Sequence, residues 1–218
     1  MEMVTLAAKK TFHNLPGEKQ HKIIAVAIQE FAAKGYQKAS INNMIANLGI
    51  AKGSMYQYFE NKESLFLYIF EYGVHKIKEN IRQAEESIQP DHDVFAKITA
   101  YFSSTIEFVK NYPLIFHLYL RTVFETDVPF KQEIVRKIRL SSIEYLISLL
   151  EQGKQRGEIR KDCNLQLTAF IFDATIDRLL QSCIGSYFDS ASDFQQAFVN
   201  LRENVEEVIE ILRQGLAA

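Results

Sequence analysis

The sequence contains little cysteine and no recognisable metal-binding or redox motif. Cys163 and Cys183 are its only cysteines, and no C-x-x-C pair occurs. In a cytosolic protein two such cysteines are normally reduced and structural, and a redox switch is the less favoured alternative. The five histidines are scattered and no H-E-x-x-H occurs, so we expect no metal site and no cofactor.

Long hydrophobic runs are also missing. No apolar run reaches the roughly 18–20 residues that a membrane-spanning helix requires. The first residues, MEMVTLAAKKTFHNLPG, lack the hydrophobic region and the cleavage site of a secretory signal. With 47% hydrophobic and 24% charged residues, the composition is that of a globular protein. We therefore expect a cytoplasmic protein without a membrane partner.

Catalytic signatures and strand patterns are absent as well. The sequence has neither the G-x-S-x-G of a nucleophile elbow nor the G-x-x-x-x-G-K-[ST] of a phosphate-binding loop. Alternating apolar and polar residues form no stretch of useful length, and no internal repeat is visible. These absences favour an all-α protein that is not an enzyme.

The net charge of −2 alone argues against a nucleic-acid-binding protein, but the distribution of charge favours one. Residues 1–62 hold 8 lysines against 4 acidic residues, whereas residues 63–218 hold 17 basic against 23 acidic residues. A basic N-terminal part suits binding to phosphates, and an acidic remainder stays away from them. Chance asymmetry is the alternative interpretation.

Residues 40–62, SINNMIANLGIAKGSMYQYFENK, have the pattern of two short helices joined by a tight turn. The first helix has an apolar stripe at i, i+3, i+4 and i+7. The stripe consists of Ile41, Met44, Ile45 and Leu48. Ser40 can cap this helix, and Gly49 can end it in the left-handed conformation. A second helix fits Lys52 to Phe59, so the pair predicts a helix-turn-helix whose second helix can lie in the DNA major groove.

This stretch resembles the tetracycline-repressor (TetR) family of bacterial transcription regulators. The positions that carry the resemblance are Ile23, Ile24, Ala27, Phe31, Gly35, Tyr36, Ile45, Ala46, Gly49, Ile50, Lys52, Gly53, Tyr56, Tyr58, Phe59, Lys62, Glu63 and Leu65. The sequence departs from the family at Ala51, where the family usually has a serine that can cap the recognition helix. The loss of a cap costs about 0.5–2 kcal/mol of local stability.

Helical periodicity continues to the C-terminus. We expect helices over about residues 16–35, 62–89, 114–124, 129–155, 165–188 and 193–214, and one that Asp91 or Asp93 caps and that runs to about Lys110. Residues 1–14 have the pattern of a loose tail. The predicted fold class is all-α, with a three-helix DNA-binding head over residues 1–60 and a larger effector-binding and dimerisation body over residues 61–218.

The resemblance implies which residues contact DNA. These are Ser40, Lys52, Gly53, Ser54, Tyr56, Gln57, Tyr58 and Lys62. Ser40 and Lys62 stand at helix starts and are expected to hold phosphates. Ser54 and Gln57 are the candidates for reading bases, since a glutamine can make two hydrogen bonds to adenine. For Tyr58, packing into the protein is an equal alternative.

The last two helices are the predicted dimer interface. Residues 165–188 are apolar almost all round, and residues 193–214 have one apolar stripe. In the family such helices form a four-helix bundle across a two-fold axis. We therefore expect a homodimer through residues 165–212, with Leu201, Val205 and Leu212 buried between protomers. Its two heads should read an inverted repeat in double-stranded operator DNA.

The resemblance places an effector inside the body, which is rich in aromatic residues. The expected ligand is mainly apolar or aromatic, and the candidate contacts are Tyr101, Phe102, Phe116, His117, Arg121, Tyr145 and Asp177. Residue by residue, a purely structural role is the favoured alternative for these rings, and also for the pair of Asp173 and Asp177.

The function predicted from the sequence is a homodimeric, ligand-responsive transcriptional repressor. One alternative is an all-α enzyme or small-molecule carrier in which the helix-turn-helix is incidental. Another is a DNA-binding activator without an effector. Lys52, Tyr56 and Lys62, at the ends and on the outer face of one short helix, favour DNA binding over the enzyme.

Overall fold

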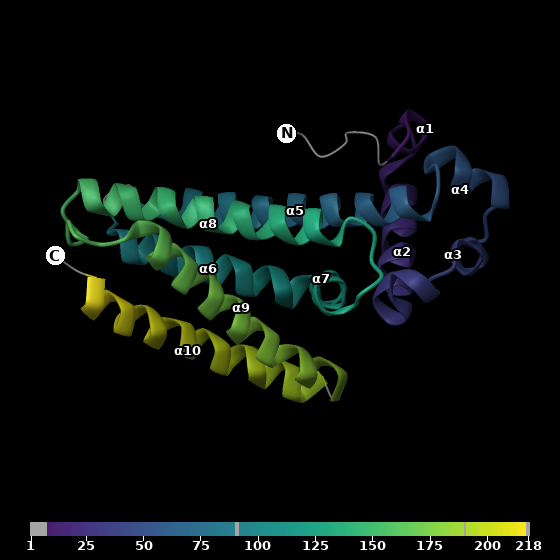
Figure 1. Cartoon of the computed structure of the whole chain (residues 1–218). Helices are drawn as coiled ribbons and strands as arrows, with labels where there is room; N and C mark the ends of the chain where they lie inside the picture. The colour runs from purple at the N-terminus through teal and green to yellow at the C-terminus, as the bar shows by residue number, and fades with distance from the viewer. Residues whose placement is uncertain (1–7, 90–91, 190, 217–218) are drawn as a thin grey trace. The chain divides into compact units, whose positions relative to one another are not determined.

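The computed structural model describes residues 8–89, 92–189 and 191–216, with side chains described except at positions 183–199. The described elements are all helices, and the predicted all-α fold is confirmed (Figure 1). Their bounds are α1 Lys10–His13, α2 Gly17–Lys38, α3 Ile41–Leu48, α4 Lys52–Tyr58, α5 Lys62–Ser87, α6 Val94–Asn111, α7 Pro113–Phe124, α8 Lys131–Gln155, α9 Leu165–Asp189 and α10 Ala191–Leu216.

The chain forms two compact units. The first unit consists of Met1–His75 and Leu114–Ile134, and the second of Lys76–Pro113 and Val135–Ala218. Helices α5 and α8 each run from one unit into the other. Helix α7 thus folds with the N-terminal helices. The predicted division into a DNA-binding head and an effector-binding body concerns function, and it stays a prediction.

The first unit is held together by the buried face of α2 and the aromatic residues that pack on it. The ring of Phe31 meets the ring of Phe66 edge to face, with 5.1 Å between centroids, and Phe66 meets Tyr36 at 5.0 Å. The regular helix is interrupted at Gly35, where it was predicted to end. Gly35 has a φ of 70° and a ψ of 171°, which kinks α2, and one further helical turn continues to Lys38.

The predicted loose N-terminal tail is partly wrong. Residues 10–13 form the short helix α1, and the side chain of Phe12 is 0% exposed. Burial of one aromatic side chain contributes about 1.5–3 kcal/mol, which holds so short a segment in place. Residues 1–7 lie outside the described residues.

The second unit has its core between α6, α8, α9 and α10. The centroids of Phe102 on α6 and Phe172 on α9 lie 5.8 Å apart. Asp93 caps α6, because its carboxylate accepts from the Ala96 amide at 2.8 Å, whereas Asp91 lies outside the described residues. The amide of Arg160 donates to the carbonyl of Leu216 at 3.1 Å. This bond joins the turn before α9 to the end of α10.

One of the two cysteines, Cys163, lies in the core. Cys163 is a buried free thiol, and its sulfur lies 3.2 Å from the hydroxyl of Thr168. The side chain of Cys183 lies outside the described residues. Cys163 therefore packs as a small core residue.

Candidate functional site

The helix-turn-helix forms as its turn residues predict. The hydroxyl of Ser40 accepts from the amide of Asn43 at 3.4 Å and caps α3. Gly49 ends α3 with a φ of 65° and a ψ of 32°, the left-handed conformation that glycine adopts at low cost. Ala51 stands at the start of α4 without a side-chain cap, as predicted. These local features hold the two helices in the arrangement of a DNA-binding motif.

Helix α4 presents one outward face and one buried face. Lys52, Gly53 and Gln57 are exposed, and so is the ring of Tyr56. Ser54 is half-buried. The predicted base-reading and phosphate-binding side chains of this helix thus share one side, and their contacts with DNA stay predictions.

Tyr58 belongs to the opposite face. It is only 6% exposed, and its ring meets that of Phe12 edge to face at 6.2 Å. The structure therefore supports the inward-packing alternative and corrects its assignment as a DNA contact. The reason is the position of Tyr58 three residues after the buried Met55, on the same face of the helix.

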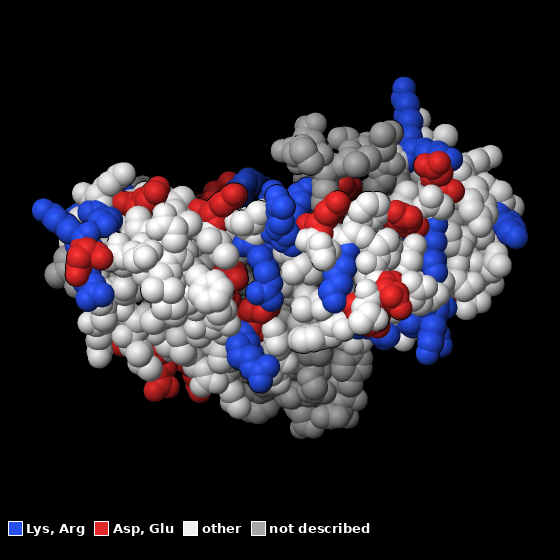
Figure 2. All heavy atoms as spheres, viewed as in Figure 1, with Lys and Arg blue, Asp and Glu red and all other residues white. Residues whose placement is uncertain are grey.

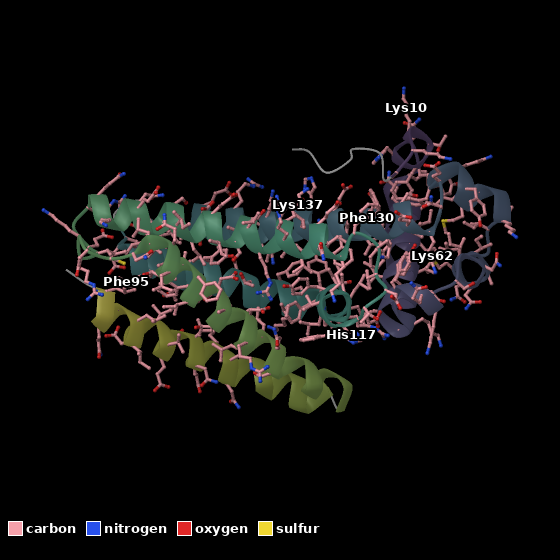
Figure 3. All side chains as sticks on the ribbon, viewed as in Figure 1. Lys10, Lys62, Phe95, His117, Phe130 and Lys137 are labelled. Carbon is pink, nitrogen blue, oxygen red and sulfur yellow. The ribbon has the colours of Figure 1, made fainter. Side chains whose placement is uncertain are left out.

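Lys62 has a role that the sequence did not reveal. Its ammonium donates to the carbonyl of Tyr36 at 2.8 Å and to the carbonyls of Gln37 and Ala39 at 3.2 Å each. Figure 3 shows Lys62 beside α2, within the first unit. An ammonium has three N–H donors, and here three carbonyls at the end of α2 accept from it. A phosphate contact by Lys62 stays a prediction, and it would compete with these bonds.

Charge on the first unit agrees with the predicted DNA partner. Figure 2 shows basic side chains protruding from the part of the surface that α1 to α4 form, and in these helices every basic residue with a fixed charge is a lysine. Lys52 at the start of α4 and Lys38 at the end of α2 are both exposed. Basic groups around a recognition helix attract the phosphate backbone.

A cavity of about 280 Å³ opens between α5, α6 and α8 in the second unit. It is lined by Ile81, Ala84, Glu85, Ile88, Gln89, Lys97, Ala100, Tyr101, Tyr145, Leu149 and Gln152. The rings of Tyr101 and Tyr145 lie 4.8 Å apart at this cavity. Two of the seven predicted ligand residues are thus brought together.

Hydrogen bonds hold both phenols in place. The hydroxyl of Tyr145 donates to Oε1 of Glu85 at 2.5 Å, and that of Tyr101 lies 2.8 Å from the hydroxyl of Ser142. Ser142 in turn donates to Asp173 at 2.6 Å. Burial raises the pKa of Tyr101 to about 12, and burial together with Glu85 raises the pKa of Tyr145. Both hydroxyls are therefore protonated at neutral pH.

The remaining predicted ligand residues do not line this cavity. Phe102 is buried against Phe172 in the core. Asp177 forms an ion pair with Arg139 at 3.1 Å and accepts from Gln181 at 2.9 Å. Its surroundings therefore support the structural alternative, in which the carboxylate is already paired.

Phe116, His117 and Arg121 belong to α7 in the first unit. Burial, and next the positive charge of Arg121, lower the pKa of His117. Arg121 donates to Oε1 of Glu125 at 2.6 Å and to the carbonyls of Ala32 and Ala33 at 3.2 Å each. Arg121 thus fixes α7 to the kinked part of α2.

Of the three residues predicted to be buried between protomers, only Leu212 is partly accessible in the single chain. Leu201 and Val205 are 2% and 1% exposed within the single chain, so they belong to its own core and their predicted burial between protomers is wrong. Leu212 is half-buried. Among the described side chains of α9 and α10, the large apolar ones that are exposed are Leu167, Phe170, Ile171 and Ile211. Positions 183–199, within the predicted interface, have no described side chains.

The described part of the chain holds neither a metal-binding cluster nor a helix that could span a membrane. There, no three His, Cys, Asp or Glu side chains gather closely enough to hold a metal ion. Within the same residues, each helix is too short or too polar to cross a membrane.

Known proteins resemble the chain along most of its length. The family described as "Bacterial regulatory proteins, tetR family" matches residues 23–69, and "Tetracyclin repressor-like, C-terminal domain" matches residues 92–217. The HTH-type transcriptional regulator YhgD of Bacillus subtilis, itself uncharacterized, is 30% identical over 155 residues, which are 71% of this chain and 78% of that protein.

Two further proteins are similar over most of their length. The fatty acid metabolism regulator protein of Bacillus subtilis is 25% identical over 169 residues, which are 76% of this chain and 84% of that protein. A TetR family transcriptional regulator from Chloroflexus aurantiacus has a crystal structure that superposes with a TM-score of 0.75 at 30% identity, covering 97% of this chain and 99% of that one.

Proposed function

This chain belongs to the TetR family and is a DNA-binding transcriptional regulator; from that premise we propose that it is a repressor whose homodimer binds an inverted-repeat operator and releases it when a small molecule occupies the cavity. As a DNA-binding regulator it would work in the cytoplasm. The observation that carries the proposal is the exposed side of α4, where Lys52, Tyr56 and Gln57 are accessible while Met55 is buried.

The proposed DNA contacts follow from this face. Lys52 and the start of α3 at Ser40 would hold phosphates, which position the protein without reading sequence. Gly53 has no neighbouring atom within 4 Å of the place where a side chain would begin, so a DNA backbone can approach it. Ser54 and Gln57 would read bases from the major groove.

Selection of genomic fragments with the purified protein tests this assignment. An enriched inverted repeat is expected, with half-sites about 34–36 Å apart or a multiple of that distance. Gln57→Ala should change which bases are preferred in each half-site. Lys52→Gln should weaken binding to all sequences and reduce the salt slope by about 1. If the selection enriches no sequence, the proposed operator readout is wrong.

The proposed dimer uses the exposed side of α9. Leu167, Phe170 and Ile171 recur at the spacing of one helical face, opposite the buried Phe172 and Ile176. Such a continuous apolar face on a monomer marks an interaction surface. A second copy is the occupant that the inverted-repeat operator requires, since one short helix reads few base pairs.

The proposed effector is a mainly apolar or aromatic small molecule. The cavity walls combine aliphatic side chains, two tyrosine rings and a few polar groups, which is the usual composition of a ligand site. The name of the similar Bacillus subtilis protein links that protein to fatty acid metabolism, which agrees with an apolar ligand. Tyr145, Glu85 and Lys97 would supply the polar anchors.

Helix α5 is the proposed link between ligand and DNA. It begins at Lys62 in the first unit, and its residues Ile81, Ala84 and Glu85 line the cavity in the second. A ligand that binds more tightly to one position of α5 would favour that position and change the spacing of the two recognition helices. A shift from 1:99 to 99:1 needs roughly 5.5 kcal/mol of differential affinity.

A further inference from the structure

We propose that residues 9–12, which precede the first matched family segment, cap the C-terminal end of the recognition helix α4 and so hold this helix in position. No residue of this segment was among the predicted DNA contacts. Lys9, Thr11 and Phe12 are therefore assigned as positioning residues, which act on DNA recognition through the backbone of α4.

Helix α4 needs outside support. It has seven residues and no side-chain cap at its start, and an isolated helix of that length is unstable in water. The carbonyls of the last turn of a helix have no partners within the helix. In α4 two of these carbonyls belong to Tyr56 and Gln57, whose exposed side chains are proposed to meet DNA.

Three consecutive carbonyls at the end of α4 accept hydrogen bonds from the N-terminal segment. The ammonium of Lys9 donates to the carbonyl of Tyr56 at 2.9 Å, and the amide of Lys9 donates to the carbonyl of Tyr58 at 2.8 Å. The hydroxyl of Thr11 donates to the carbonyl of Gln57 between them. The positive charge of Lys9 also lies at the end of α4 where the helix dipole favours it.

Phe12 anchors these donors. Its side chain is 0% exposed, and its ring centroid lies 4.9 Å from that of Phe59 and 5.1 Å from that of Tyr68 on α5. The side-chain amide of Gln20 on α2 donates to the carbonyl of Leu15, just after α1, at 2.8 Å. The segment is therefore fixed to three helices of the first unit, and its donors are held at α4.

The cap bears on specificity because it acts on the segment that carries Tyr56 and Gln57. If the last turn of α4 frays, both side chains lose their fixed direction toward the major groove. The DNA would then have to order the turn on binding, which lowers affinity. Exposed Lys10 projects outward from α1 in Figure 3 and provides a control with the same charge.

Amide hydrogen exchange in the full-length protein without DNA tests the cap directly. The probe is the amide of Phe59, which donates to the carbonyl of Met55 at 2.9 Å in the last turn of α4. Thr11→Val keeps the shape of the side chain and removes the donor, so exchange in this turn should accelerate about two- to tenfold. Thr11→Ser keeps the donor and should leave the rate unchanged. Equal rates in all three proteins would overturn the proposal.

Operator binding then separates a cap from a phosphate contact. Lys9→Met should accelerate exchange in α4 and weaken operator binding. Lys9→Gln keeps an N–H donor without the charge, so it should retain most of the protection from exchange and most of the operator affinity. Lys10→Met should leave exchange in α4 unchanged. If Lys9→Met and Lys9→Gln lower the salt slope equally and neither affects exchange, Lys9 is a phosphate contact and the proposal is wrong.

The anchor gives a second, independent test. Phe12→Ala should accelerate exchange in α4 on the order of a hundredfold or more, since a buried aromatic side chain is lost. Phe12→Leu retains much of the buried volume and should restore most of the protection and of the operator affinity. Exchange in α9 should not change in either variant. Uniform acceleration in all helices would mean general unfolding and would overturn a role specific to α4.

Discussion

The ammonium of Lys62 lies 2.8 Å from the carbonyl oxygen of Tyr36 and 4.5 Å from the centre of its ring. This contact fixes the first residue of α5 to the end of α2. A cation near a helix C-terminus is favoured by the helix dipole, and a cation over an aromatic face adds a second attraction. Because α5 continues into the second unit, Lys62 sets the starting point of the proposed signalling helix.

Lys62→Met should therefore destabilise the first unit. The variant keeps the apolar stem and loses hydrogen bonds from a charged donor, which contribute about 1.5–3 kcal/mol each before solvent exposure reduces them. We expect faster hydrogen exchange at the end of α2, with α9 unaffected. Lys62→Arg, which retains charge and donors, is the control. A variant with unchanged exchange and only a lower salt slope would instead support the predicted phosphate contact.

Gly35→Ala should destabilise the same unit for two separate reasons. The backbone at Gly35, with a φ of 70° and a ψ of 171°, lies in a region that costs other residues about 1–3 kcal/mol. A Cβ atom there would also lie 2.7 Å from both carboxylate oxygens of Glu125.

A double-mutant cycle with Glu125→Ala separates these causes. Removing the carboxylate relieves the contact with Glu125 and leaves the backbone cost and a 2.9 Å contact with the Arg121 guanidinium, so Gly35→Ala should be less harmful in the Glu125→Ala background. Urea unfolding, followed by the circular dichroism of the helices, gives the unfolding free energy of each of the four proteins. If Gly35→Ala lowers this free energy equally in both backgrounds, the close approach to Glu125 contributes nothing.

Helical periodicity could predict most of the fold, because α3, α6 and α10 each bury one stripe and cap residues mark their ends. It could not predict α1. A four-residue helix has no periodicity, and Phe12 is ordered only by rings that are distant in sequence. A lysine at a helix start likewise gives no sign of the carbonyls that Lys62 reaches.

The site was predicted less completely, for a physical reason. The stripe containing Leu201 and Val205 is apolar, but an apolar stripe does not reveal whether its partner is the same chain or a second copy. In the sequence, α9 is apolar almost all round, so its exposed stripe of Leu167, Phe170 and Ile171 could not be distinguished from its buried side. Tyr101 and Tyr145 could be named from composition, but their meeting at one cavity depends on tertiary packing.

Leu167→Asp should dissociate the proposed dimer. Leu167 is 55% exposed on α9, and a carboxylate at that position would be buried without a partner between two copies. Light scattering at micromolar concentration should show a dimer for the original protein and a monomer for the variant, with weaker operator binding. Leu140→Asp, at an exposed leucine on α8, is the control and should remain dimeric. A dimer in both variants would contradict the proposed face.

Asp173 should make stability fall as pH rises. The side chain is 8% exposed, and burial raises its pKa, opposed by the hydrogen bond from Ser142 and by Arg139. The folded protein then binds more protons than the unfolded one between the two pKa values. Stability is therefore fully present below the unfolded value, about 3.9, and declines through the folded value.

Asp173→Asn removes this titration and can still accept from Ser142. The unfolding free energy of the variant, relative to that of the original protein, should increase with pH above about 4 and level off once Asp173 is ionised in the fold. Urea unfolding at a series of pH values measures the difference. A difference that does not change with pH would contradict the role assigned to burial.

The cavity leads to the last prediction, which concerns coupling. The bond between Tyr145 on α8 and Glu85 on α5 holds the cavity-lining part of α5 in place without a ligand. A ligand with its own polar group can replace this bond and so favour another position of α5. Tyr145→Phe removes the hydroxyl proposed to anchor the ligand and should weaken effector binding about two- to tenfold, while Tyr112→Phe, away from the cavity lining, should not.

Leu149→Trp provides the sharper variant, because the larger side chain fills the cavity instead of altering one bond. Thermal shift with candidate apolar ligands reports binding, and fluorescence anisotropy of labelled operator reports release in parallel. We expect Leu149→Trp to bind operator normally and to respond to no ligand that releases the original protein. If a ligand still releases operator from Leu149→Trp, the effector binds elsewhere. If a ligand binds the original protein tightly and leaves operator affinity unchanged, the cavity holds a ligand but α5 does not carry its signal.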